Sequence, residues 1–80
     1  MKAVLFTRAA QKQLGKLPLR AREDLVAKFE RFLETGAGDI KKMEEEPGLR
    51  LRHGAYRAVF VMEEEALVVV RIGHRRDVYR

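Results

Sequence analysis

Arginine, histidine and tyrosine recur in four short polar clusters in the C-terminal half of the chain, and these residue types suit phosphate chemistry. If the apolar segments around the clusters pair as neighbouring strands, the clusters converge on one face of a sheet. The clusters are Arg50 with Arg52, Arg57 beside Tyr56, the run Gly73-His74-Arg75-Arg76, and Tyr79 with Arg80.

This set of side chains fits metal-independent cleavage of RNA. In that reaction the 2′-hydroxyl loses a proton and attacks the adjacent phosphorus, negative charge builds on the phosphoryl oxygens, and the 5′-oxygen leaves with a proton. Preorganised arginines stabilise the charge but are poor bases. Histidine is the usual acid or base near neutral pH, which makes His74 the candidate for either role. Tyr79 can stack on a nucleobase, donate a hydrogen bond or move a proton.

The same residues also have plain structural interpretations. Tyr56 fits a half-buried strand aromatic, and Arg71 fits a side chain that covers the core with its stem or pairs with a glutamate. A lone histidine such as His74 is more often structural than catalytic, and His53 fits an exposed turn. The glutamates at 63–65 fit a solvated hairpin tip.

The elements that must position these clusters begin with two helices. An apolar segment at Ala3–Phe6 is followed by Thr7, a good N-cap, and by helix-forming residues. Pro18 ends this first helix and can open a second. The first helix has one apolar face, and the second has a longer stripe before the stop signal Gly36. The first face consists of Ala10, Leu14 and Leu17, and the stripe of Leu25, Val26, Phe29, Phe32 and Leu33.

Three strands are predicted after a loose connection at residues 37–48, which includes one short extended piece near Ile40–Met43. The strands are Leu49–Arg52, Tyr56–Met62 and Ala66–Ile72, separated by a turn and a charged tip. The run Val68-Val69-Val70 predicts a central strand covered on both faces. The order strand, helix, helix and three strands predicts an α+β fold, in which a helix hairpin packs on a small, mainly antiparallel sheet.

Composition limits the class of protein. Eighty residues predict one domain over residues 1–80, and a net charge of +5 fits a polyanionic partner, although a solvated charged surface would look the same. All lysines precede Pro47, whereas every basic residue after it apart from histidine is arginine, whose planar fork grips phosphate. There is no cysteine, no apolar run of about 20 residues and no signal-peptide pattern. We therefore expect a cytoplasmic protein without a membrane segment.

Two motifs resemble the toxins of the RelE/ParE superfamily of bacterial and archaeal toxin–antitoxin systems. They are Gly-x-Tyr-Arg at residues 54–57 and Gly-His-Arg-Arg-Asp-Val-Tyr at residues 73–79, within the segments 49–60 and 68–79. The N-terminal strand and helices also fit, so the resemblance spans essentially the whole chain. It implies a RelE-like fold and, for the RelE branch, cleavage of messenger RNA in the ribosomal A site without a metal or other cofactor.

The resemblance also implies roles for individual residues. Arg57 matches the arginine that binds the scissile phosphate, and Arg75 matches one implicated in charge stabilisation or leaving-group protonation. Tyr79 matches a tyrosine that orients or stacks on the substrate, and His74 takes over proton transfer, as in some relatives. Arg50 stands where the family often has a lysine. We expect the substrate-binding residues to be Arg50, Arg52 and Arg76.

One departure from the family pattern and two other functions remain. Gly48 occupies a place where one lysine of a basic pair is common in the family. ParE-like members poison DNA gyrase and are not nucleases, and a non-catalytic RNA-binding module needs only the basic face. A toxin implies a small, acidic cognate antitoxin that folds on binding and forms a toxin–antitoxin hetero-oligomer.

Overall fold

The structure, a computed structural model, describes residues 2–74, and it has the predicted α+β fold. The predicted order of elements is confirmed, and the short extended piece expected in the long connection is a strand of its own. The elements are β1 (Ala3–Phe6), α1 (Arg8–Gly15), α2 (Leu19–Thr35), β2 (Ile40–Lys42), β3 (Leu49–His53), β4 (Tyr56–Met62) and β5 (Ala66–His74).

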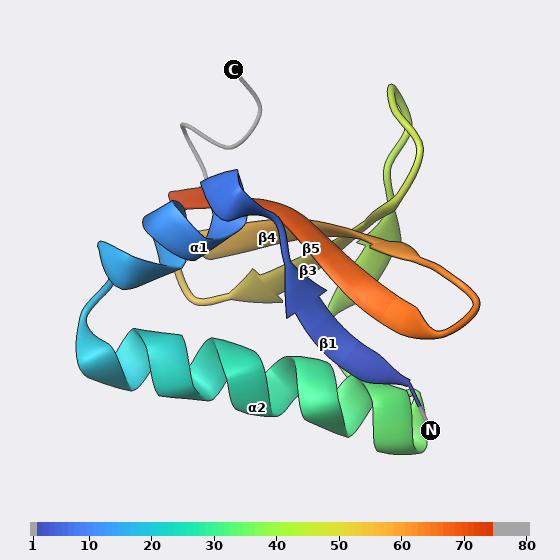
Figure 1. The fold of residues 1–80 in the computed structure, drawn as a ribbon, viewed down its shortest axis with the longest axis horizontal. Helices are drawn as coiled ribbons and strands as arrows, with labels where there is room; N and C mark the ends of the chain where they lie inside the picture. The colour runs from blue at the N-terminus through green and yellow to red at the C-terminus, as the bar shows by residue number, and fades with distance from the viewer. Residues whose placement is uncertain (1, 75–80) are drawn as a thin grey trace.

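The five strands form one mixed sheet in the order β1-β5-β4-β3-β2 (Figure 1). Strand β1 is parallel to β5, and the other three pairs are antiparallel, so the mainly antiparallel sheet is confirmed. Helix α1 lies against β5 and β1, while α2 runs along the sheet as a second layer (Figure 1). We call the face of the sheet toward the core and α2 the core face, and the opposite one the outer face.

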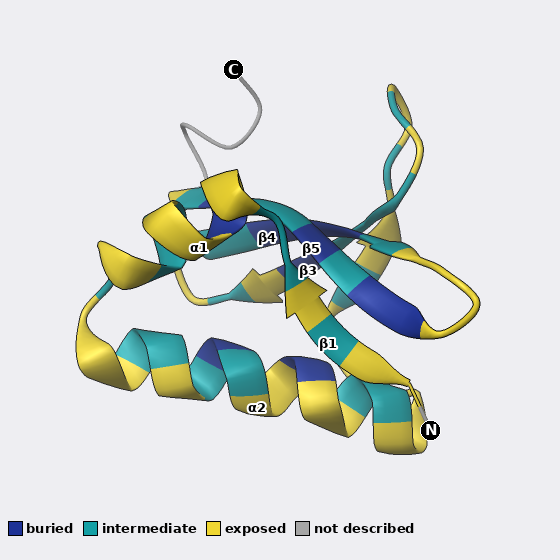
Figure 2. Ribbon diagram, in the orientation of Figure 1, coloured by how far each residue is buried: buried dark blue, intermediate teal, exposed yellow. Residues whose placement is uncertain are grey.

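The core lies between α2 and the sheet, because the apolar stripe of α2 meets the inward residues of the strands (Figure 2). Leu25 and Phe29 of α2 are fully buried. The ring of Phe29 meets the rings of Phe6 and Phe60 edge to face, with centroids 6.5 and 5.3 Å apart. Helix α2 stops where predicted, since Gly36 has a φ of 74° and donates its N–H to the Phe32 carbonyl.

Helix α1 continues the edge of the sheet where β1 ends. The Thr7 hydroxyl accepts from the Ala10 N–H as the predicted N-cap and also donates to the Val70 carbonyl, each at 3.1 Å. The Ile72 N–H donates to Gln13 Oε1 at 2.6 Å. The pairing of β1 with β5 ends at Phe6 and Val69. Beyond that pair, these bonds satisfy backbone groups of β5 that β1 no longer reaches. Helix α1 therefore fixes the end of β5 that carries the polar clusters.

A β-bulge in β5 decides which residues of that strand face outward. Phe60 pairs with Val69, but Val59 pairs with Arg71, so Val70 is the extra residue. Strict alternation from Val69 would turn Arg71 inward, whereas the bulge turns it outward and buries Ile72. The bulge also lies within the run of three valines, so this part of β5 need not alternate strictly between apolar and polar residues. Although β5 is an internal strand, Val68 and Val70 are only half-buried, so it is less covered than the valine run predicts.

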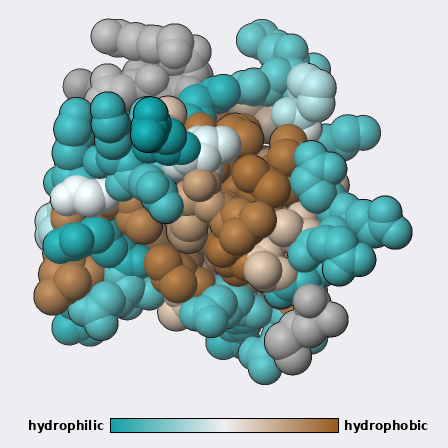
Figure 3. All heavy atoms as spheres, viewed as in Figure 1, coloured by the Kyte–Doolittle hydropathy of each residue, from teal (hydrophilic) through white to brown (hydrophobic). Residues whose placement is uncertain are grey.

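The edge of the sheet at β1 carries apolar side chains that gather on the face shown in Figure 3. A groove beside β1 is lined by Val4 and Phe6 and, on α2, by Val26 and Leu33. Within residues 2–74, no helix is long and apolar enough to cross a membrane.

Candidate phosphate-binding face

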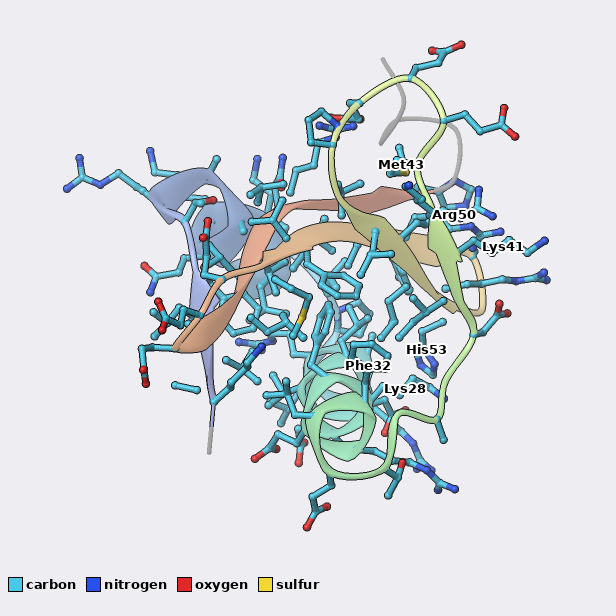
Figure 4. All side chains as sticks on the ribbon, turned by 90° about the vertical axis from the view of Figure 1, so that its right-hand side faces the viewer. Lys28, Phe32, Lys41, Met43, Arg50 and His53 are labelled. Atoms are coloured by element: carbon cyan, nitrogen blue, oxygen red, sulfur yellow. The ribbon has the colours of Figure 1, made fainter. Side chains whose placement is uncertain are left out.

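A row of basic side chains crosses the outer face. The strand register aligns Lys41 of β2 with Arg50 of β3, Arg50 with Val59 of β4, and Val59 with Arg71 of β5. Adjacent strands lie about 4.8 Å apart, so three cations stand within about 15 Å. Figure 4 shows Arg50 on the side of the sheet away from α2, and His53 on the side toward the helix, where Phe32 of α2 also lies. Val59 is fully buried between the two arginines.

A second row contains the central residue of the predicted site. Arg52 pairs with Arg57, and Arg57 pairs with Gly73, so both arginines face outward beside the first row. Arg57 is half-buried, and its Nη1 donates to the carbonyls of Gly54 and Tyr56 at 2.8 and 2.9 Å. The turn thus holds one nitrogen of the guanidinium, while its fork has further donors for a ligand.

The expectation that the polar clusters share one face is wrong for His74, which lies on the face of the β4–β5 pair opposite to Arg57. His74 pairs with Tyr56, and the two rings meet edge to face with centroids 6.4 Å apart. Because Tyr56 and Arg57 are consecutive in β4, their side chains point to opposite faces. His74 is exposed at the end of β5, directly after the cross-strand partner of Arg57. The two residues can therefore approach one phosphate only around this end of the strands.

The other predicted residues of the C-terminal cluster, Arg75, Arg76 and Tyr79, lie outside the described residues. The convergence of all four proposed catalytic side chains on a single phosphate therefore stays a prediction.

Arg71, like Lys41, lies on this face although the sequence alone predicts no functional role for it. It forms a two-pronged ion pair with Glu46: Nη1 donates to Oε2 at 3.1 Å, and Nη2 donates to Oε1. Pairing with a glutamate was one of the two structural interpretations of Arg71, and it is confirmed. The hydrogen bond from Arg71, aided by its positive charge, lowers the pKa of Glu46, although partial burial opposes the shift. No local pattern reveals that Arg71 faces outward, because a bulge shifts the alternation.

Gly48, at the place of a common family lysine, is required by the local backbone. Its φ is 115°, a region that favours glycine. A Cβ at this position would lie only 2.8 Å from the Phe60 carbonyl oxygen and 3.2 Å from Val61 Cγ1. A lysine therefore does not fit this backbone, and arginines of the neighbouring strands supply the positive charge of the face.

Two further contacts between basic and acidic side chains lie near the face. Arg52 Nε lies 3.9 Å from Asp39 Oδ2, and both side chains are more than half exposed, so this pair contributes little. His53 is half-buried and not an exposed turn residue as expected: its Nε2 lies 3.5 Å from Asp24 Oδ2 of α2. The turn proper is confined to Gly54 and Ala55. Across residues 2–74, no three histidine, aspartate or glutamate side chains gather as a metal-binding group.

The arrangement can bind a polyanion. Guanidinium groups from three adjacent strands face the same way, and each presents several donors in a fixed fork that matches phosphate oxygens. Phosphate contacts of this kind fix the position of a nucleic acid strand without reading its sequence.

Comparison with known proteins identifies the family. Residues 4–79 match the family model of the ParE toxin of the type II toxin–antitoxin system parDE. No curated protein sequence matches. The structure of RelBE2 from Mycobacterium tuberculosis, a toxin–antitoxin complex, is similar with a TM-score of 0.76 and 28% identity over 92% of this chain and 98% of the other.

Two further solved structures agree. Isolated RelE toxin from E. coli is similar with a TM-score of 0.75 and 26% identity over 99% of this chain and 92% of the other. RelE in its complex with RelB from Methanococcus jannaschii has the same fold, with a TM-score of 0.76 and 24% identity over 94% of each chain. With the family model spanning nearly the whole chain, these matches show that the protein belongs to the ParE toxin family, within the RelE/ParE superfamily of type II toxins.

Proposed function

We propose that this toxin is a metal-independent endoribonuclease that cuts messenger RNA in the ribosomal A site and so stops translation. The observation that carries the proposal is the outer face, on which Arg57 stands among outward-facing basic residues of neighbouring strands. Similarity to RelE toxins, at 26% identity to the isolated E. coli protein, supports the same branch.

The residues divide the chemistry between them. Arg57 binds the scissile phosphate and stabilises the charge that builds on its oxygens, and Arg75 adds to this charge stabilisation or protonates the leaving 5′-oxygen. His74 accepts the proton of the 2′-hydroxyl or donates a proton to the leaving 5′-oxygen. Tyr79 stacks on the nucleotide or orients it. Attack of the 2′-oxygen on phosphorus breaks the bond to the 5′-oxygen, leaving a 2′,3′-cyclic phosphate and a 5′-hydroxyl.

The scissile phosphate then sits at the end of the β4–β5 pair. Arg57 faces outward there and His74 faces the other way, only one residue beyond the partner of Arg57. A phosphate placed over the middle of the outer face is within reach of Arg50 but not of His74. We therefore propose that Arg50, Arg52 and Arg76 hold the flanking phosphates.

The same proposal includes a partner and a location. Similar toxins from Mycobacterium tuberculosis and Methanococcus jannaschii were crystallised as toxin–antitoxin complexes. We propose that this chain acts as a single toxin domain, that a cognate acidic antitoxin binds it as a hetero-oligomer, and that it works in the cytoplasm, where the ribosome presents its substrate.

The test is a translation assay in which the 5′ ends of the message are mapped. Wild-type protein cuts ribosome-bound message, and Arg57→Ala does not, although its circular dichroism spectrum and unfolding midpoint stay close to those of the wild type. Arg20→Ala is the matched control, because Arg20 is an exposed arginine on α2, away from the outer face. A message left whole by wild-type protein contradicts the proposal.

Inhibition of DNA gyrase is the second candidate, because the matching family model takes its name from ParE of parDE. A gyrase poison produces double-strand breaks in DNA and leaves message intact. Running a plasmid cleavage assay with gyrase beside the translation assay separates the two functions, since each predicts damage to one substrate only.

A further inference from the structure

The carboxylate of Glu46 is held by Arg71, an arginine of the outer face. Its two oxygens accept from the two terminal nitrogens of Arg71: Oε2 accepts from Nη1 at 3.1 Å, and Oε1 accepts from Nη2. A phosphate offers two oxygens to an arginine fork in the same manner, and the two anions compete for the same donors. Arg71 is thus an anion-binding group that the chain's own carboxylate already occupies.

The pair lies within reach of an incoming strand. About one third of each side chain is exposed, 32% for Arg71 and 34% for Glu46. Arg71 stands in the same cross-strand row as Arg50 and Lys41, and the bulge at Val70 is what turns it to that face. Bulges commonly re-aim side chains next to functional sites.

The segment that carries Glu46 forms one wall of a hollow on this face. The β2–β3 connection closes with a hydrogen bond from the Met43 N–H to the Gly48 carbonyl at 3.1 Å. The lining of a hollow of about 540 Å³ includes both the glutamates at 44–46 and the basic residues Lys41 and Arg50. In Figure 4 the connection rises above the sheet on the side of Arg50 and Met43. An anion in the hollow meets both the basic row and the acidic loop.

We propose that Arg71, together with Arg50 and Lys41, forms a second phosphate-binding subsite for the RNA strand, and that Glu46 occupies this subsite in the free toxin as an internal competitor. The inference rests on the proposed function, because it takes RNA as the ligand. On binding, a backbone phosphate replaces the carboxylate at Arg71, and the loop of glutamates moves away from the strand.

The exchange is feasible because one monoanion replaces another. The carboxylate and the phosphodiester each carry one negative charge, so Arg71 stays paired throughout. A partly exposed ion pair is only weakly stabilising, so contacts of neighbouring phosphates with Arg50 and Lys41 are enough to displace Glu46. The acidic loop therefore weakens RNA binding without preventing it.

The test compares two glutamine variants of the full chain that differ by one position. Affinity is measured for a 2′-O-methyl oligoribonucleotide, which binds like RNA but lacks the attacking hydroxyl. We expect Glu46→Gln to bind roughly two- to five-fold more tightly than Glu45→Gln, which removes the same charge from an exposed neighbour. In an Arg71→Gln background affinity falls, and the advantage of Glu46→Gln over Glu45→Gln disappears.

Equal affinity of the two single variants overturns the inference, as does an advantage of Glu46→Gln that survives in the Arg71→Gln background. Either result would mean that the ion pair of Glu46 with Arg71 only holds the loop in place. The outcome is independent of cleavage, because the probe cannot be cut. Failure of the proposed function shows separately, as intact message in the translation assay while the variants still differ in binding.

Discussion

At the scale of single residues, the outer face depends on the shape of arginine as well as on its charge. Arg57 uses one nitrogen to bind two carbonyls of its own turn, which orients the remaining donors of the fork. A lysine carries the same charge but has no planar fork to divide between a turn and a phosphate. Geometry and charge at this position can therefore be separated by experiment.

Arg57→Lys tests this distinction. We expect the rate of message cleavage to fall about 100- to 1,000-fold, the usual cost of removing one preorganised donor from a charge-stabilising site. The unfolding midpoint stays near the wild-type value, because the residue is only half-buried. A lysine variant with the wild-type rate shows that positive charge alone is sufficient.

The ion pair of Glu46 makes a pH-dependent contribution to stability. Because Arg71 holds the pKa of Glu46 below its ordinary value of 4.5, the folded state favours the charged carboxylate. This contribution is fully present above pH 4.5 and is lost as the pH falls through the lowered folded-state pKa. The urea midpoint of the wild type therefore exceeds that of Glu46→Gln at pH 7, and the difference shrinks in acid. A difference that is constant with pH contradicts the charge effect.

At the scale of elements, the sequence predicts most of the fold because its local signals agree with one another. Thr7 and Gly36 mark where the helices begin and end, and the stripe around Phe29 identifies the buried face of α2. The alternation of Leu49, Arg50, Leu51 and Arg52 gives the correct faces of β3.

What sequence reasoning missed depends on contacts between distant segments. The bulge at Val70 and the hydrogen bond from the Ile72 N–H to Gln13 Oε1 are set by the packing of β5 against its neighbours, and no local pattern encodes them. For this reason the sequence alone predicts no function for Arg71, which faces outward and pairs with Glu46. The position of His74, in contrast, follows from alternation once the register is known. Tyr56 and Arg57 are consecutive in β4 and point to opposite faces, and His74 pairs with Tyr56.

Gly48 offers a test of how the β2–β3 connection joins the sheet. Gly48→Ala should lower the free energy of unfolding by about 1–3 kcal/mol, because the methyl group meets the Phe60 carbonyl and φ is positive. Gly15→Ala is the control: nothing lies within 4 Å of its added Cβ, so its stability should be unchanged or slightly higher. Chemical denaturation measures both, and equal effects would contradict the steric account.

At the scale of the whole molecule, the apolar core and the rows of basic side chains lie on opposite faces of one sheet. The core face is sealed by α2 and the aromatic cluster of Phe6, Phe29 and Phe60, whereas the outer face presents cations to solvent. A chain of 80 residues can therefore combine a compact core with a broad charged surface.

The salt dependence of RNA binding measures how many cations of this surface contact phosphate. We expect the logarithm of affinity for the 2′-O-methyl oligoribonucleotide to fall with the logarithm of salt concentration, with a slope of roughly −2 to −3 for three or four contacts. Lys41→Ala reduces the steepness by about 0.7, while Lys12→Ala on the exposed side of α1 leaves it unchanged. Equal slopes for the two variants would show that the RNA does not contact Lys41.

The most direct measurement of the central claim is the mapping of 5′ ends on message translated with wild-type, Arg57→Ala and Arg20→Ala protein. The account predicts new 5′-hydroxyl ends within ribosome-bound codons for the wild type and Arg20→Ala, and none for Arg57→Ala. Cleavage by a folded Arg57→Ala variant at the wild-type rate, or a message left whole by all three, would contradict it.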